Sequence, residues 1–522
     1  MNKTIDIILS PEEAFGEHFS LNRKLDLPES DWYIRPVKRS IDARGRNIVV
    51  HMQVEAIRKP FSPDVPSFHY ADVSKSAEVI VVGSGPAGLF AALRLIELGF
   101  RPIVLERGKD VRARRRDLAA INKENIVNPE SNYCFGEGGA GTYSDGKLYT
   151  RSKKRGNVLR ILQIMVANGA TEEILFDAHP HIGTNNLPKL VTALREQIIA
   201  AGGVVRFDSK VTDFIIESSE CRGVKLHSGE VLRGVSVILA TGHSARDIFH
   251  ILDQKKILIE AKAFALGVRI EHHQSLIDKI QYHCAVDRGP FLPASSYALV
   301  HQAKVGGRER GVFSFCMCPG GFIVPAATSP GEVVVNGMSP SRRDSKYANS
   351  GIVVAVDPAD FKSYEKYGAL AGMYFQSDIE RKACEVAGGT QAAPAQRMID
   401  FTQSKFSSGL PDTSYQPGVV SSELSTVLPG FINESLRQGL INFGSKMKGY
   451  LTNDAQVLGV ESRTSSPVRI PRNDDTLEHP QIAGLFPCGE GAGYAGGIVS
   501  AAMDGERCAE AVGKKYLYRK LT

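Results

Sequence analysis

The 522-residue chain lacks long apolar segments. A membrane-spanning helix needs a run of about 18 or more apolar residues, and no such run occurs. The first ten residues, MNKTIDIILS, include the charged Asp6 and lack the apolar core of a signal peptide. We therefore expect a soluble, cytoplasmic protein.

Cysteine and net charge are also scarce. Eight scattered cysteines do not make a disulfide framework, so reduced thiols are expected. The 63 basic and 57 acidic residues leave a net charge of only +6, which gives little support to nucleic-acid binding. Glycine is plentiful, with 50 residues, as suits a backbone that approaches a ligand closely. The length predicts two or three domains.

Residues 79–88 have the pattern of a phosphate-binding turn. A short apolar run at 79–82 suits a buried strand, and Gly83, Gly85 and Gly88 follow it in the spacing G-x-G-x-x-G. The first glycine allows a tight turn, the second lets the backbone approach a diphosphate, and the third lets a helix pack on the strand.

The next residues complete a βαβ unit. Apolar residues at helical spacing predict a helix over 86–98, whose N-terminus offers free N–H groups to an anion. A strand at 102–105 follows, and Glu106 lies 18 residues past Gly88, where an acid accepts hydrogen bonds from a ribose. The pattern predicts a dinucleotide site, the alternative being a glycine-rich turn in an unrelated α/β domain.

A second G-x-G-x-x-G match, at Gly491, Gly493 and Gly496, has another meaning. Only 26 residues follow it, too few for a further βαβ unit with its acid. The strand V-I-L-A-T-G, at 237–242, and a C-terminal segment with Gly489 and Glu490 instead indicate one extended cofactor. A carboxylate at Glu490 is placed to bond a polyol.

Together these segments resemble the glutathione-reductase type of FAD-binding fold. The motifs C-F-G-E-G-G-A-G-T-Y-S-D-G-K-L-Y-T-R at 134–151, R-S-I-D-A-R at 39–44, C-M-C-P-G-G at 316–321 and E-S-R-T-S-S-P-V-R at 461–469 resemble a family of bacterial FAD-dependent dehydrogenases of largely undefined substrate, over nearly the whole chain. The resemblance implies non-covalent FAD, a redox role and an added N-terminal module. It also assigns the ribityl contact to Glu490, in place of the usual Asp, and a backbone contact with adenine to Val211.

The predicted fold is α/β, with a glutathione-reductase-type FAD-binding Rossmann domain, an inserted α+β domain and a small N-terminal β-α-β-β module. The module covers residues 1–72, with a helix over 11–25 and a stiff linker at Pro60, Pro63 and Pro66. The FAD domain covers 76–255 and 453–522, and the insertion covers 256–452. A small-molecule substrate is expected between the last two.

The loop at 136–147 is the other candidate cofactor contact. Its five glycines indicate close approach to a flat ring, and Lys147 is available to stabilise negative charge on reduced flavin. A flexible surface loop is the alternative. The complete predicted cofactor-binding set is Gly83, Gly85, Pro86, Ala87, Gly88, Glu106, Arg107, Gly138, Gly139, Thr142, Lys147, Val211, Thr241, Gly242, Gly489, Glu490, Gly497 and Ile498.

Cys316 and Cys318 lie on a predicted strand, so both thiols are expected on one face, as packing residues rather than a redox pair. No zinc-ligand spacing accompanies them, and no metal site is predicted. His243 and His301 are conceivable acid–base groups, but their spacing selects neither, and the catalytic residue stays unassigned.

Two short basic clusters follow cofactor segments, Arg112, Arg114, Arg115 and Arg116 in one and Arg151, Lys153, Lys154 and Arg155 in the other. Solvated surfaces are the simpler interpretation, with a nicotinamide 2′-phosphate or RNA as alternatives. The sequence predicts a FAD-dependent oxidoreductase that exchanges a hydride between flavin N5 and an organic substrate or NAD(P)H. The other class left open is an RNA- or protein-binding module with a structural FAD.

Overall fold

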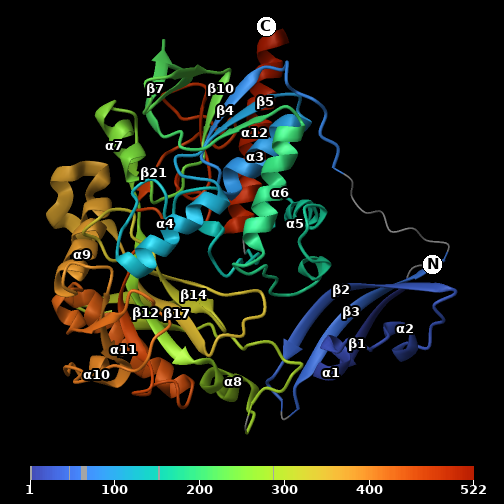
Figure 1. Cartoon of the computed structure of the whole chain (residues 1–522), viewed down its shortest axis with the longest axis vertical. Helices are drawn as coiled ribbons and strands as arrows, with labels where there is room; N and C mark the ends of the chain where they lie inside the picture. Colours follow the sequence, from blue (N-terminus) through green and yellow to red (C-terminus); the bar gives the residue numbers. More distant parts are fainter. Residues whose placement is uncertain (1–2, 46, 60–67, 151–152, 286, 522) are drawn as a thin grey trace.

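A five-stranded parallel sheet carries the first glycine motif at the carboxyl end of a central strand (Figure 1). The computed structural model describes residues 3–45, 47–59, 68–150, 153–285 and 287–521. The sheet has the order β22-β10-β4-β5-β6. Its strands are β4 (Glu78–Val82), β5 (Arg101–Leu105), β6 (Val204–Arg206), β10 (Ser236–Leu239) and β22 (Leu485–Pro487). The predicted α/β fold with a parallel sheet is confirmed.

Both faces of this sheet are buried, which explains why its strands are apolar throughout. One face packs under α3 (Pro86–Glu97), α5 (Val158–Ala167), α6 (Leu187–Ala200) and α12 (Ile498–Leu521), which lie together in Figure 1. The other face packs under α7 (Arg246–Gln254) and the antiparallel sheet of β7 (Val211–Glu217), β8 (Glu220–Leu226) and β9 (Val231–Arg233).

The inserted segment builds a seven-stranded sheet of order β13-β14-β17-β12-β20-β18-β19. Its strands are β12 (Phe264–His273), β13 (Val300–Val305), β14 (Arg308–Cys318), β17 (Tyr347–Val356), β18 (Ala393–Arg397), β19 (Val419–Ser421) and β20 (Gln456–Glu461). Because β20 pairs with β12 and β18, this sheet extends past the boundary drawn at residue 452. The helices around it are α8 (Gln274–Tyr282), α9 (Ala371–Val386), α10 (Met398–Thr402) and α11 (Gly430–Lys446).

Short elements connect the two larger sheets. The helix α4 (Val111–Glu124) follows β5, and two-stranded ribbons form from β11 (Glu260–Ala261) with β21 (Val468–Arg469) and from β15 (Phe322–Pro325) with β16 (Val335–Met338).

The N-terminal module is an antiparallel sheet of order β1-β3-β2, from β1 (Lys3–Leu9), β2 (Trp32–Asp42) and β3 (Val49–Arg58). The single helix predicted over 11–25 is wrong. Two short helices occur instead, α1 (Pro11–Phe15) and α2 (Leu21–Lys24), because Ser10 and Ser20 each supply an N-cap. The linker prolines Pro60, Pro63 and Pro66 lie outside the described residues.

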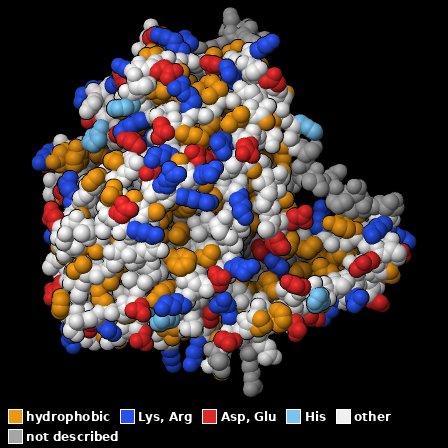
Figure 2. All heavy atoms as spheres, viewed as in Figure 1, with side chains coloured by type: hydrophobic (Ala, Val, Ile, Leu, Met, Phe, Trp, Pro, Cys, Tyr) orange, Lys and Arg blue, Asp and Glu red, His pale blue; other side chains and the backbone are white. Residues whose placement is uncertain are grey.

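Arg39 of β2 fastens the module to the rest of the protein. Its guanidinium donates two hydrogen bonds to Asp177, at 2.7 and 3.1 Å, and lies 4.7 Å from the Phe15 ring and 5.1 Å from the Phe176 ring. Its backbone N–H donates to Phe176 O at 2.9 Å. Acidic and basic side chains are interspersed over the visible face of the molecule (Figure 2). Among the described helices, none is long and apolar enough to cross a membrane.

Candidate functional site

A cavity of about 430 Å³ lies between the five-stranded and seven-stranded sheets. Most of the predicted cofactor-binding residues line it: Gly83, Gly85, Pro86, Ala87, Glu106, Arg107, Gly139, Lys147, Val211, Thr241, Gly242, Glu490, Gly497 and Ile498. Gly88, Gly138, Thr142 and Gly489 are not in its wall. The fold thus brings together predicted residues that are up to 415 positions apart in the sequence, from Gly83 to Ile498.

The glycine motif at β4 and α3 has the geometry of a phosphate-binding turn. Gly83 has a φ of +104°, and a Cβ there would approach Ala240 O to 2.5 Å. A Cβ at Gly88 would lie 1.9 Å from Gly83 O, so this glycine serves the packing of helix on turn. Gly85, the N-cap of α3, has no side chain to satisfy the first N–H groups, which are therefore available to an anion.

The Glu106 carboxylate accepts several hydrogen bonds from the protein itself. One carboxylate oxygen accepts from Ser84 N–H at 3.0 Å and Ser84 Oγ–H at 2.7 Å. The other accepts from the N–H groups of Gly108 and Gly136, both at 3.0 Å. A carboxylate has about four lone-pair sites, so these four donors occupy it, and only the Ser84 hydroxyl among them can rotate away.

The loop at 136–147 is held in place by contacts that the sequence did not suggest. The N–H of Gly138 donates to Ser84 O at 3.0 Å, and Thr142 Oγ donates to Glu137 O at 2.8 Å. Gly138 and Thr142 therefore support the loop from behind, whereas Gly139 and Lys147 face the cavity.

Arg114 is a functional residue that the sequence reasoning missed. It was grouped with a solvated basic cluster, but its side chain is fully buried. Its guanidinium donates to the carbonyl oxygens of Asn132, Glu137 and Gly139, at 2.8, 3.0 and 3.0 Å. The spacing of the sequence could have indicated its burial, because Arg114 lies at helical spacing on the same face of α4 as the buried Val111, Leu118 and Ile121.

The opposite wall comes from the insertion, and both Cys316 and Cys318 line it. A β-bulge in β14 gives Cys316 a φ of +43°, and Cys316 is exposed in the cavity wall whereas Cys318 is buried. The Cys318 thiol donates to Cys316 O at 3.3 Å. Burial among protein atoms raises the pKa of the Cys316 thiol to about 12, so it is neutral at neutral pH.

Two buried arginines support this wall. Arg269 pairs with Glu461 at 2.7 Å and donates to Cys316 O at 2.7 Å, which holds the bulge. Arg463, in the cavity wall, pairs with Glu332 and Glu380 of the insertion at 2.7 and 2.9 Å.

The Glu380 carboxylate also joins the two larger domains. Arg246, on α7, pairs with Glu380 of α9 at 2.8 Å. Burial alone would raise the pKa of Glu380, but Arg246 and Arg463 lower it to about 2. The carboxylate is therefore ionised at neutral pH.

Of the two candidate histidines, only His243 faces the cavity. Its Nε2 lies 3.0 Å from Arg463 O, which favours a proton on that nitrogen, and its Nδ1 lies 3.6 Å from Glu490 Oε1. His301 lies on β13, outside the cavity wall. Lys147 Nζ donates to Met317 O, linking the glycine loop to the bulged strand.

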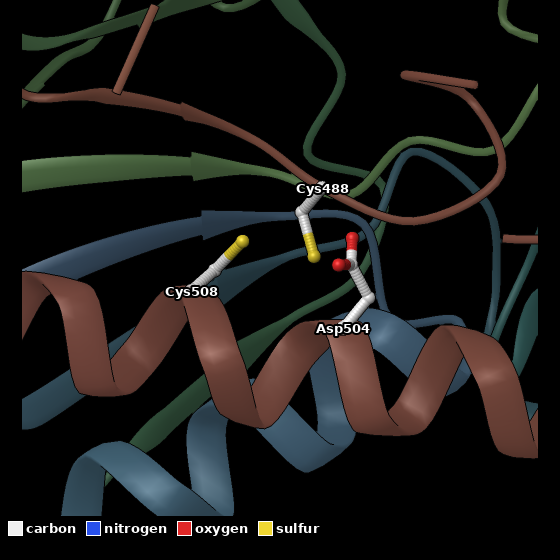
Figure 3. Close-up of side chains that lie close together, drawn as sticks. All are labelled: Cys488, Asp504 and Cys508. Carbon is white, nitrogen blue, oxygen red and sulfur yellow. The ribbon is translucent and has the colours of Figure 1, made fainter. Parts of the chain in front are cut away.

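Cys488, Asp504 and Cys508 converge behind the cavity in the manner of a metal site (Figure 3). The guanidinium of Arg472, however, donates to both Asp504 oxygens, at 2.6 and 2.9 Å, and lies 3.4 Å from Cys508 Sγ. A cation already neutralises the carboxylate, so the cluster contains a buried ion pair between Arg472, in the segment that precedes β22, and Asp504 of α12.

Comparisons with known proteins bear on the same segments. A FAD binding domain model matches residues 76–120, a model described as "FAD-dependent protein, C-terminal domain-like" matches 263–464, and a domain of unknown function matches 1–57. An uncharacterized protein of Clostridium beijerinckii is 42% identical over 499 residues, which is 92% of each chain. Human mitochondrial dihydrolipoyl dehydrogenase is 31% identical over 74 residues, 14% of each chain.

Solved structures give more distant similarities. A flavin-dependent brominase shares 13% identity at a TM-score of 0.36, over 85% of this chain and 83% of its own. An L-proline dehydrogenase from P. horikoshii shares 14% identity at a TM-score of 0.32, over 84% and 94%.

Proposed function

The chain belongs to a family of FAD-dependent proteins that includes its Clostridium beijerinckii relative, and we propose that it transfers a hydride between flavin N5 and an organic substrate bound in the cavity. The protein is a FAD-dependent oxidoreductase. The observation that carries the proposal is the cavity itself, whose walls come from the FAD-binding domain on one side and from the insertion on the other.

The residues present fit FAD. A Cβ at Gly85, Gly496 or Gly497 would meet no heavy atom within 4 Å, so the backbone is open to a ligand at these three cavity-lining positions. The uncapped start of α3 suits the diphosphate, and the start of α12 places a second positive helix end at the cavity. Glu106, Val211 and Glu490 are the proposed contacts for ribose, adenine and ribityl chain. When bound non-covalently there, FAD supplies N5 as the atom that accepts or gives the hydride.

The side chains of the cavity divide the remaining tasks. Lys147 places a positive charge in the wall, which favours negative charge on a ring bound beside it. Phe315, Cys316 and Asn336 form the insertion's side and offer an aromatic ring, a neutral thiol and an amide to a substrate. His243, hydrogen-bonded through Nε2 and near Glu490 through Nδ1, is the group best placed to hold or release a proton.

The sequence does not identify the compound that gives the hydride to the flavin. The first G-x-G-x-x-G segment alone has a complete βαβ unit among the described residues, so NAD(P)H would dock transiently rather than on its own domain. The first basic cluster offers the RNA-binding alternative one cation fewer than the sequence suggests, because Arg114 is buried and donates to three carbonyl groups.

Stopped-flow mixing of the FAD-loaded protein with NADH and NADPH tests the proposal. We expect at least one of them to reduce the flavin, and a dinucleotide deuterated at C4 to slow the reduction, because the C–H bond breaks in the measured step. If neither reduces it, organic donors are screened by the same loss of flavin absorbance. A flavin that no hydride donor reduces, although dithionite does, would contradict the proposal.

A further inference from the structure

A second cavity, strongly basic, lies against the same C-terminal segment as the FAD cavity. It has a volume of about 390 Å³. Its charged side chains come from separate parts of the chain: Lys154, Arg155, Arg469, Arg472, Asp474 and Arg507. Lys154 and Arg155 belong to the second basic cluster of the sequence, so the fold adds three distant arginines to a pair that had been interpreted as solvated surface. Arg151, of the same cluster, lies outside the described residues.

The positive charge in this basic pocket is only partly neutralised. Arg472 and Arg507 share one buried carboxylate, Asp504, at 2.6 and 3.6 Å. Lys154, Arg155 and Arg469 make no ion pair with a carboxylate of the described residues, and Asp474 is the only acidic side chain in the wall among them. Cations that lie close together without a carboxylate between them repel one another, so an anion bound among them lowers the energy of the site.

Tyr494 contacts three of the arginines that line the basic pocket. The Arg472 guanidinium lies 3.8 Å from the centre of its ring and that of Arg469 lies 5.0 Å away. The Tyr494 hydroxyl accepts from the backbone N–H of Arg472 at 3.0 Å, and the Arg155 guanidinium donates to Tyr494 O at 3.0 Å. The Arg472 fork is taken up by Asp504, so the Arg469 guanidinium, held against the ring, is the one that suits phosphate oxygens.

The basic pocket is close to the flavin site. Gly493 and Tyr494 line the basic pocket, whereas Glu490, Gly496 and Gly497 line the FAD cavity. Tyr494 and Gly497 are three residues apart, so their Cα atoms are separated by no more than about 11 Å. A ligand with phosphates in the basic pocket therefore has its other end within reach of the flavin cavity.

We propose that this basic pocket binds the phosphate groups of the nicotinamide dinucleotide that exchanges a hydride with the flavin. The inference rests on the proposed function for that redox step, in which the hydride leaves C4 of the dihydronicotinamide, which is oxidised, and bonds to flavin N5, which is reduced. The binding of phosphate at the pocket is independent of the step. Two phosphate groups of the dinucleotide could occupy the pocket. One is the 2′-phosphate of NADPH, and the other is the diphosphate common to NADH and NADPH.

Calorimetric titration of the FAD-loaded protein with 2′,5′-ADP and with 5′-ADP tests the pocket without turnover. We expect wild type to bind at least one of them, tighter binding of 2′,5′-ADP indicating the 2′-phosphate and tighter binding of 5′-ADP the diphosphate. The double variant Lys154→Glu/Arg155→Glu should bind about tenfold or more weakly, because two attractive charges become repulsive. The matched control, Arg112→Glu/Arg116→Glu on the exposed face of α4, should bind as wild type does.

Thermal midpoint and FAD content establish that each variant is folded, and Arg469→Gln replaces the double variant if that one is not. Binding of neither nucleotide by wild type, or equal binding by wild type and the pocket variant, overturns the inference. Failure of the pocket is distinguishable from failure of the proposed function. In the first case NADH or NADPH still reduces the flavin of the pocket variant at the wild-type rate, and in the second the nucleotides bind but no hydride donor reduces the flavin.

Discussion

Glu106 organises the backbone around the cavity, in addition to its proposed contact with a ribose. Its carboxylate collects donors from the first glycine turn, from Gly108 and from Gly136. Arg114 does the same for carbonyl groups of the second loop. At the residue scale, the shape of the cavity therefore depends on two buried charges that face the two loops.

Replacing Glu106 with Gln should destabilise the FAD site. An amide oxygen accepts fewer hydrogen bonds than a carboxylate, so buried N–H groups of the loops lose an acceptor, at about 1–3 kcal/mol for each. We expect a lower thermal midpoint and less FAD per chain, measured by circular dichroism and by absorbance after gel filtration. Glu230→Gln, which alters an exposed pair with Arg206, is the control and should change neither quantity.

Replacing Lys147 with Ala should make the flavin harder to reduce, because a positive charge beside the ring favours the reduced, more negative form. We expect the midpoint potential to fall by about 30 mV, the equivalent of about 1.4 kcal/mol for a two-electron couple. Lys147→Arg keeps the charge and should keep most of the potential. An unchanged potential in Lys147→Ala would remove this residue from the mechanism.

At the scale of the elements, the sequence predicted those whose apolar period is clear. The strand β4, the helix α3 and the strand β5 lie within a residue of their expected ends, since glycines and a buried apolar run fix them. The predicted elements differ from the structure where a specific side-chain contact overrides the apolar period. Ser20 starts a new helix inside the expected one, and Arg269, far away in the sequence, donates to Cys316 O in the bulge of β14.

The link between α7 and α9 should respond to acid. Since Arg246 and Arg463 hold the pKa of Glu380 at about 2, below its usual value of 4.5, its ionisation stabilises the folded state. That contribution is present above about pH 4.5 and is lost as the pH falls toward 2. The neighbouring Glu332 has the opposite shift, because burial and Glu380 raise its pKa.

Urea denaturation of wild type and Glu380→Gln as a function of pH checks this link. The variant should be less stable than wild type near neutral pH, by about 3–5 kcal/mol, because two arginines lose their buried partner. The difference should shrink as the solution is acidified. A difference that stays constant from neutral pH down to about pH 3 would contradict the assignment of the charge to Glu380.

At the scale of the whole molecule, the sequence predicted the wall of the cavity around the five-stranded sheet better than the wall from the insertion. The glycine turns carry local signals that a single sequence reveals. The insertion's wall depends on Arg269, Glu461, Glu380 and Arg463, whose partners are separated by long stretches of chain and have no spacing that a single sequence reveals. For the same reason the strand β20 was assigned to the wrong side of a boundary.

The side chain of Arg39 contributes to the attachment of the N-terminal module, beside the backbone hydrogen bonds of Arg39 with Phe176 and Ala178. Arg39→Ala removes the paired hydrogen bonds to Asp177 and the stacking between Phe15 and Phe176. We expect faster cleavage by a protease between the module and the FAD domain, with an unchanged flavin spectrum. Arg35→Ala, which breaks a pair inside the module, is the control. Equal cleavage of both variants would show that Arg39 does not hold the module.

The most direct measurement is an absorption spectrum of the purified protein, recorded before and after anaerobic addition of NADH and NADPH. The account predicts flavin bands that bleach with at least one of them, and FAD that is released intact when the protein is denatured. A protein that shows no flavin bands even after incubation with FAD would contradict it.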